Sequence, residues 1–134
     1  MGFSDDMAKF MRKAEVNVDQ VVQNTVKDIG TKLVERTPVR DGVARANWKA
    51  EVGGYSPAFT DAGDKDGSGA IANIAAVAKG VKAGDAVYVT NSAPHIMSLE
   101  HGHSDQAPHG MKAITAAEGP AIVANAVRKA TEGK

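Results

Sequence analysis

The sequence of 134 residues contains no cysteine. This absence excludes a disulfide scaffold, a zinc site built on cysteine and a thiol nucleophile. The chain also has no excess of charge of either sign, because 16 Lys and Arg balance 16 Asp and Glu. General nucleic-acid binding depends on surplus cations that neutralise phosphates, so a neutral chain is a poor candidate for it.

Long apolar runs and a basic leader are missing as well. No stretch approaches the ~18 apolar residues of a membrane-spanning helix, and Asp5 and Asp6 stand where a signal peptide would be basic. We therefore expect a soluble protein made in the cytoplasm, with no membrane partner.

Large apolar residues are scarce, whereas alanine is abundant. The chain has two Leu and three Phe against 23 Ala. The length of the chain predicts one domain over residues 1–134. Because alanine buries little area, we expect a thin core that gains from burial against other subunits.

A long helix is expected over residues 4–36. Ser4 is a good N-cap, and Pro38 forces Thr37 out of the helical region, so the helix should end near Arg36. The apolar stripe of this helix repeats every three to four residues. It consists of Met7, Met11, Ala14, Val18, Val22, Val26, Ile29 and Leu33.

The period then changes from 3.6 to 2. Apolar and polar residues alternate over 44–52, which predicts a half-buried strand with Trp48 as its largest core residue. A long helix, few strands and a terminal helix give an α+β domain. The other expected elements are a flexible polar loop over 53–69, a helix over 70–79, a strand over 86–90, a short helix over 94–100, an ordered His-rich loop over 101–110 and a closing helix over 111–131 that Gly119 and Pro120 kink or split.

A cluster of histidines suggests a zinc or iron site. A small metal-binding module or metalloenzyme is the alternative that it leaves open, against the simpler interpretation of a solvated loop. The reversed zincin pattern would need His at position 97, where the chain has Met97. The residues concerned are His95, Glu100, His101, His103, Asp105 and His109.

Other catalytic or ligand-binding motifs are incomplete. The segment 64–69 begins like a calcium loop, but its twelfth position is Ala75 instead of a carboxylate. There is no nucleophile elbow, P-loop or dinucleotide fingerprint. The motifs therefore do not predict an enzyme, a cofactor or a resident metal.

Two segments together carry a resemblance. The first segment is Thr-Pro-Val-Arg-Asp-Gly at 37–42, followed by Arg-Ala-Asn-Trp at 45–48. The second segment begins with Val-Thr-Asn at 89–91. It continues with Leu-Glu-His-Gly-His-Ser at 99–104 and ends with Gln-Ala-Pro-His-Gly-Met at 106–111. Their order, between a long N-terminal helix and a closing helix, resembles the neck or tail-completion family of head–tail joining proteins of tailed bacteriophages. The resemblance spans about residues 7–130.

The resemblance implies a structural protein of the virion without catalysis. It implies a small, mostly antiparallel sheet packed against the long helix, and a homo-oligomeric ring, a hexamer or dodecamer, at the head–tail junction. The ring would be assembled in the host cytoplasm. Its partners would be portal, head-closure or connector proteins on one side and tail terminator or tail tube proteins on the other, with DNA passing through unbound.

The resemblance also assigns roles to residues. Pro38 and Gly42 would shape the turn, Arg45 and Trp48 would begin the main strand, and Asn91 would end the later strand. Trp48 is foremost a core residue. Arg45 on the opposite face is either a solvated charge, as is usual, or a contact with a neighbouring subunit if that face lies in a ring. The candidate interface residues are Arg45, Asn91, Glu100, His101, His103, Ser104, Gln106 and Pro108, and the candidate structural residues are Pro38, Gly42, Trp48, Gly102, Gly110 and Met111.

Glu100 has two possible roles, and two parts of the chain depart from the pattern of the family. Glu100 either accepts hydrogen bonds from loop amides, which is the commoner role, or pairs with another subunit. His95-Ile96 stands where the family commonly shows Tyr-Ala, and residues 53–69 do not align with it. From their composition, the loops 53–69 and 101–110 are expected to contact the portal-side and tail-side partners.

Overall fold

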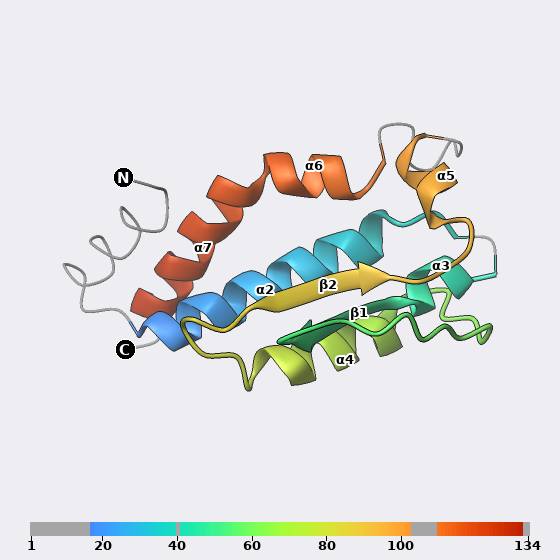
Figure 1. The fold of residues 1–134 in the computed structure, drawn as a ribbon. Helices are drawn as coiled ribbons and strands as arrows, with labels where there is room; N and C mark the ends of the chain where they lie inside the picture. The colour runs from blue at the N-terminus through green and yellow to red at the C-terminus, as the bar shows by residue number, and fades with distance from the viewer. Residues whose placement is uncertain (1–16, 40, 103–109, 133–134) are drawn as a thin grey trace.

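The computed structural model describes residues 17–39, 41–102 and 110–132. The chain is α+β, as the sequence predicts, with a long helix, a two-stranded antiparallel sheet and a C-terminal helix (Figure 1). The elements are α2 Val18–Arg36, α3 Val43–Ala46, β1 Trp48–Val52, α4 Ser68–Ala78, β2 Val87–Asn91, α5 Ile96–Glu100, α6 Lys112–Ala117 and α7 Gly119–Glu132.

The long helix α2 ends as its sequence predicts. Thr37 has an extended backbone (φ −75°, ψ 128°) immediately before Pro38, and the helix stops at Arg36. At its start, the side chain of Asn17 accepts a hydrogen bond from the amide of Gln20 at 3.2 Å. The predicted N-cap Ser4 and the first part of the apolar stripe lie outside the described residues.

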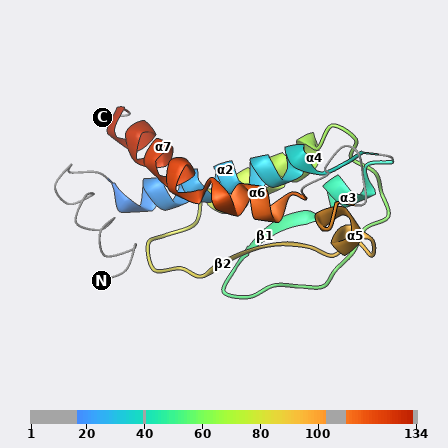
Figure 2. The same cartoon turned by 90° about the horizontal axis from the view of Figure 1, so that it is seen from above.

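The core lies between the sheet and two helices. Strands β1 and β2 form the front layer, with α2 and α4 behind it (Figures 1 and 2). Trp48 is 7% exposed, which confirms it as a core residue. Gly30 lets the two helices approach, because a Cβ there would lie 2.5 Å from a methyl group of Ile74. The buried members of this core are Val26, Leu33, Val34, Trp48, Ala50, Ala70, Ile74, Ala78 and Met111.

The start of the first strand differs from the prediction. Residues 43–46 form the short helix α3, and β1 begins only at Trp48. Gly42, in the left-handed region at φ 84°, is the N-cap, and its carbonyl accepts from the amide of Ala46 at 3.0 Å. The alternating alanines that suggested a strand fit a helix equally well, since alanine is the best helix former. Arg45 therefore lies on α3 and not on the outer face of the sheet.

The closing helix is split where the sequence predicts a break. α6 ends at Ala117 and α7 begins at Gly119, with Glu118 between them. α7 packs on the first turns of α2 through a second, smaller core of Val21, Ala126, Val127 and Ala130. None of the helices in the described ranges is both long and apolar enough to cross a membrane.

Candidate functional site

Trp48 anchors the first motif segment to the end of α2. Its indole Nε1–H donates to Oγ1 of Thr37 at 2.6 Å, and that hydroxyl donates to the carbonyl of Leu33, also at 2.6 Å. Thr37 is 1% exposed, so both hydrogen bonds are shielded from water. The indole thus has the partner that a buried tryptophan requires, and it fixes where β1 starts relative to α2.

Arg45 ties three segments together through their backbones. Its Nε donates to the carbonyl of Thr37 at 2.9 Å, one terminal nitrogen donates to Lys65 O at 2.9 Å, and the other donates to Glu35 O at 3.0 Å. The fixed fork of the guanidinium is suited to several acceptors at once. Arg45 therefore links α2, α3 and the loop before α4 within the chain, and its contact with another subunit stays a prediction.

Asn91 joins the second motif segment to the first. It ends β2, as predicted, and its Nδ2 donates to the carbonyl of Ala44 at 2.7 Å. Its Oδ1 accepts from the amide of Ala93 at 2.9 Å, which turns the chain toward α5. We call the set Thr37, Arg45, Asn47, Trp48 and Asn91 the polar joint, because each of these side chains bonds to another part of the chain.

Asn47, the last member of the polar joint, holds residues 56–60, which we call the strap. Its Oδ1 accepts from the amide of Thr60 at 3.0 Å, and its Nδ2 donates to the carbonyl of the same residue at 2.9 Å. The side-chain amide thus pairs with one backbone unit as a neighbouring strand would. The sequence gives Asn47 no such role, since it reads only as a polar residue of an alternating strand.

The next outward residues of β1 continue this pairing. Lys49 Nζ donates to the carbonyl of Ala58 at 2.9 Å, and the Glu51 carboxylate accepts from the amide of Ser56 at 2.9 Å. Asn47, Lys49 and Glu51 therefore hold every second residue of the strap, which runs in the opposite direction to β1. Part of the loop predicted over 53–69 is thus laid along the first strand; its flexibility stays a prediction.

Gly42 allows the turn of the first motif to meet the loop before α4. Its carbonyl accepts from the amide of Asp64 at 3.1 Å. A Cβ at Gly42 would lie 2.5 Å from that amide nitrogen, and its φ of 84° disfavours any other residue. Pro38, which ends α2, and Gly42 therefore have the turn-shaping roles that the resemblance implies.

Glu100 caps the following helix. One carboxylate oxygen accepts from the amides of Met111 at 3.0 Å and Lys112 at 2.7 Å, at the start of α6. This is the local role considered the commoner one, and an acidic side chain at a helix N-terminus is favourable. A Cβ at Gly110 would lie 2.3 Å from the carbonyl oxygen of Glu100, so a glycine is required there. Met111 is fully buried and Gly102 has a positive φ of 83°.

The histidine cluster is only partly described. His95 and His101 are exposed, and the Glu100 carboxylate is engaged with α6. The described residues contain no group of three or more side chains that could hold a metal ion. His103, Ser104, Asp105, Gln106, Pro108 and His109 lie outside the described residues.

The acidic residues of the incomplete calcium loop hold the start of α4. Asp64 accepts from the amide of Ala70 at 2.9 Å. Asp66 accepts from the amide of Ser68 at 3.0 Å and from its hydroxyl at 2.8 Å. These two hydrogen bonds, the amide first, lower the pKa of the exposed Asp66 carboxyl below its ordinary value of 3.8.

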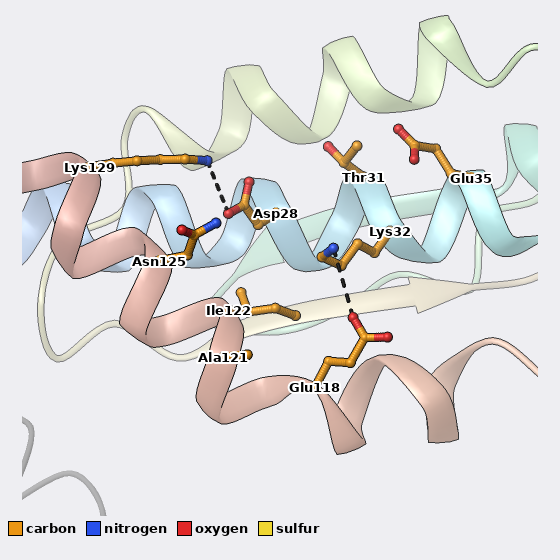
Figure 3. A pocket seen from close by; sticks show the side chains of 9 residues that line it. All are labelled: Asp28, Thr31, Lys32, Glu35, Glu118, Ala121, Ile122, Asn125 and Lys129. Atoms are coloured by element: carbon orange, nitrogen blue, oxygen red, sulfur yellow. Dashed lines mark hydrogen bonds and ion pairs between the residues drawn. The ribbon is translucent and has the colours of Figure 1, made fainter.

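A charged groove of about 370 Å³ lies between α2 and α7 (Figure 3). At one end Lys129 pairs with Asp28 at 3.4 Å, and at the other Glu118 pairs with Lys32 at 3.8 Å and with Arg36 at 2.5 Å. Opposite charges thus face each other across the groove, and they orient α7 on α2. These partners are 82 to 101 residues apart in the sequence, so no local pattern could have indicated them.

Large apolar side chains are exposed near the strap. Tyr55 is 66% exposed and stacks at a tilt on Tyr88 of β2, with ring centroids 5.7 Å apart. Phe59 and Val52, also in this region, are each 48% exposed, whereas Met97 on α5 is 61% exposed. Exposed aromatic residues are typical of protein–protein contact surfaces.

Comparisons with protein-family models, curated proteins and solved structures gave no match.

Proposed function

We propose that this chain is a structural subunit of the head–tail junction of a tailed bacteriophage. As a neck or tail-completion protein, it would form a homo-oligomeric ring between portal-side and tail-side components. The supporting observation is that Asn91, in the first part of the second motif segment, donates to the carbonyl of Ala44, which lies between the two parts of the first segment. The polar joint therefore connects the first segment of the resemblance with the start of the second.

The polar joint supports a positioning role for the motif residues. Arg45, Asn47 and Asn91 use their side chains on carbonyls and amides of their own chain. Contacts with portal-side or tail-side proteins would instead come from the surface that the joint positions. The strap and its flanks are the best candidates, because Tyr55 and Phe59 are exposed there.

Assembly by surface complementarity needs no chemistry from the chain. The absence of net charge agrees with a ring through which DNA passes without being held. Glu100 would hold the start of α6 in place by accepting hydrogen bonds from its first amides.

The experiment is a deletion of the gene from the phage genome that carries it, followed by complementation. We expect DNA-filled heads and separate tails without the gene, and infectious particles when the wild-type gene returns. A double Y55A/F59A variant should fold normally by circular dichroism but fail to restore joining. The matched control M97A removes an equally exposed apolar side chain away from the strap and should restore it. Normal virions without the gene would refute the joining role, and full complementation by Y55A/F59A would refute the contact surface.

A further inference from the structure

Strand β2 has a free edge. In an antiparallel pair, opposite residues alternate between hydrogen-bonded and non-hydrogen-bonded pairs. The amide of Gly53 donates to the carbonyl of Ala86 at 2.8 Å, which makes this a hydrogen-bonded pair of the β1–β2 register. Two and four residues further along β2, Tyr88 and Thr90 are therefore also hydrogen-bonded to β1.

The intervening residues point their backbone groups the other way. Val87 and Val89 direct their N–H and C=O groups away from β1, and no group in the described ranges bonds to them. Among the described elements, β2 contacts β1 far more than any other. Seen from above, α6 and α7 lie beside β2 and not over it (Figure 2).

This edge lacks the features that usually prevent edge-to-edge pairing. The strand Val-Tyr-Val-Thr-Asn has no charged residue and no proline, and its register with β1 continues over all five residues without a bulge. A sheet of only two strands also gains stability from further strands. An edge of this kind binds another extended backbone, and a neutral strand meets its own copy without repulsion between like charges.

We propose that the free chain dimerises by antiparallel pairing of β2 with β2 of a second copy, about a two-fold axis at Val89. The pair makes one four-stranded sheet. Val89 faces its own copy, and Tyr88 lies opposite Thr90 of the second copy on the outer face. The contact is isologous, as in most soluble homodimers.

The dimer does not depend on the proposed function. A two-fold contact reverses the direction of the second copy, so it cannot by itself build a ring whose two faces meet different partners. The dimer is therefore the form of the chain outside any such ring, in which the edge is covered and protected from aggregation.

Proline substitutions test the free edge of β2 independently of the edge that is paired with β1. Val89→Pro removes an N–H that points away from β1, and proline is tolerated on the open side of an edge strand. Thr90→Pro removes an N–H that bonds to β1. In native mass spectrometry we expect a wild-type dimer, a V89P monomer with native circular dichroism, and a T90P variant with a lowered melting temperature. A monomeric wild-type chain, or a folded V89P dimer, would overturn the proposal.

A cysteine cross-link tests the register without disturbing the backbone. The chain has no cysteine of its own. In the proposed dimer the Cα atoms of residue 88 and residue 90 of the second copy are about 4.5 Å apart, within the range of a disulfide. Oxidation of the double variant Y88C/T90C should give a covalent dimer. The single variant Y88C should give little, because residue 88 lies opposite residue 90 of the second copy and not opposite residue 88. Equal cross-linking of the two variants would overturn the register, and no cross-linking of either would overturn the pairing.

Discussion

Replacing Arg45 by methionine tests whether the first motif works inside the chain. Methionine keeps much of the apolar stem of the side chain but removes all the donors. In the structure these donors serve the carbonyls of Thr37, Lys65 and Glu35. If Arg45 is an internal link, the variant loses stability as an isolated chain. If it only contacts a neighbour, the isolated chain keeps its stability.

The expected magnitude follows from the surroundings of the three hydrogen bonds. The bond to Thr37 O is partly buried, and its loss leaves a carbonyl of a residue that is 1% exposed without this partner. Such a loss lowers the free energy of unfolding by about 1–1.5 kcal/mol. The other two bonds are exposed and water can replace them, so we assign them about 0.5 kcal/mol each. The three losses together amount to about 2–2.5 kcal/mol.

Urea unfolding followed by fluorescence measures this loss directly. Trp48 is the only tryptophan of the chain, and it lies beside the altered site. With a slope of about 2 kcal/mol per molar urea, the midpoint should fall by about 1 M at an unchanged slope. The matched control is Arg128→Met, since Arg128 lies exposed on α7, where it donates to Asn125 of its own helix. We expect the control to change the midpoint by less than a quarter as much. Equal midpoints for wild type and R45M would refute the internal role.

Three further predictions concern the same region. Thr37→Val removes the acceptor of the Trp48 indole and should lower the free energy of unfolding by about 1–3 kcal/mol in urea titrations, because the buried N–H is left unpaired; an unchanged midpoint would contradict this. Gly67→Ala should destabilise more than Gly53→Ala in thermal melts: both glycines have positive φ, but only the Cβ at 67 would lie 2.4 Å from a valine methyl of α2, whereas the one at 53 meets open space. The carboxyl of Asp66 should titrate by NMR below 3.8, since the serine that begins α4 donates to its charged form. Because this pKa is lower in the folded chain, its contribution to stability is present above 3.8 and is lost as pH falls through the folded value, and Asp66→Asn should remove that dependence.

Most of the fold can be predicted from the periodicity of apolar residues and from the prolines and glycines at the ends of elements. Pro38 marks the end of α2, and Gly119 begins α7 after a break. The prediction of a strand from residue 44 is wrong at its start, where α3 forms. The alternation there consists of alanines, and a single methyl group fits the pleat of a strand and the turn of a helix equally well. The deciding feature is the left-handed Gly42 at the start of α3, a backbone property that the residue type permits but does not require.

The sequence indicates the residues of the candidate site but not the groups that they contact within the chain. Arg45 and Asn91 are interface candidates through the resemblance, and that role stays a prediction. Within the chain, both side chains have hydrogen-bond partners. Their partners are backbone carbonyls, which every residue carries and no sequence pattern distinguishes. Glu100 was the exception, since a carboxylate shortly before a helix has a known local use at the helix amides.

The alternating residues of β1 also have partners that the sequence does not indicate. Trp48 and Ala50 face the core, as a half-buried strand requires. The polar residues that alternate with them, one just before the strand and two within it, would ordinarily face water. Instead, Asn47, Lys49 and Glu51 hold alternate residues of the strap. The strap is thereby placed by side chains and not by a backbone ladder, so its position depends on three residue types and its own sequence is left free. Such a segment can vary its exposed aromatic residues, and with them its partner, while the sheet beneath it stays the same.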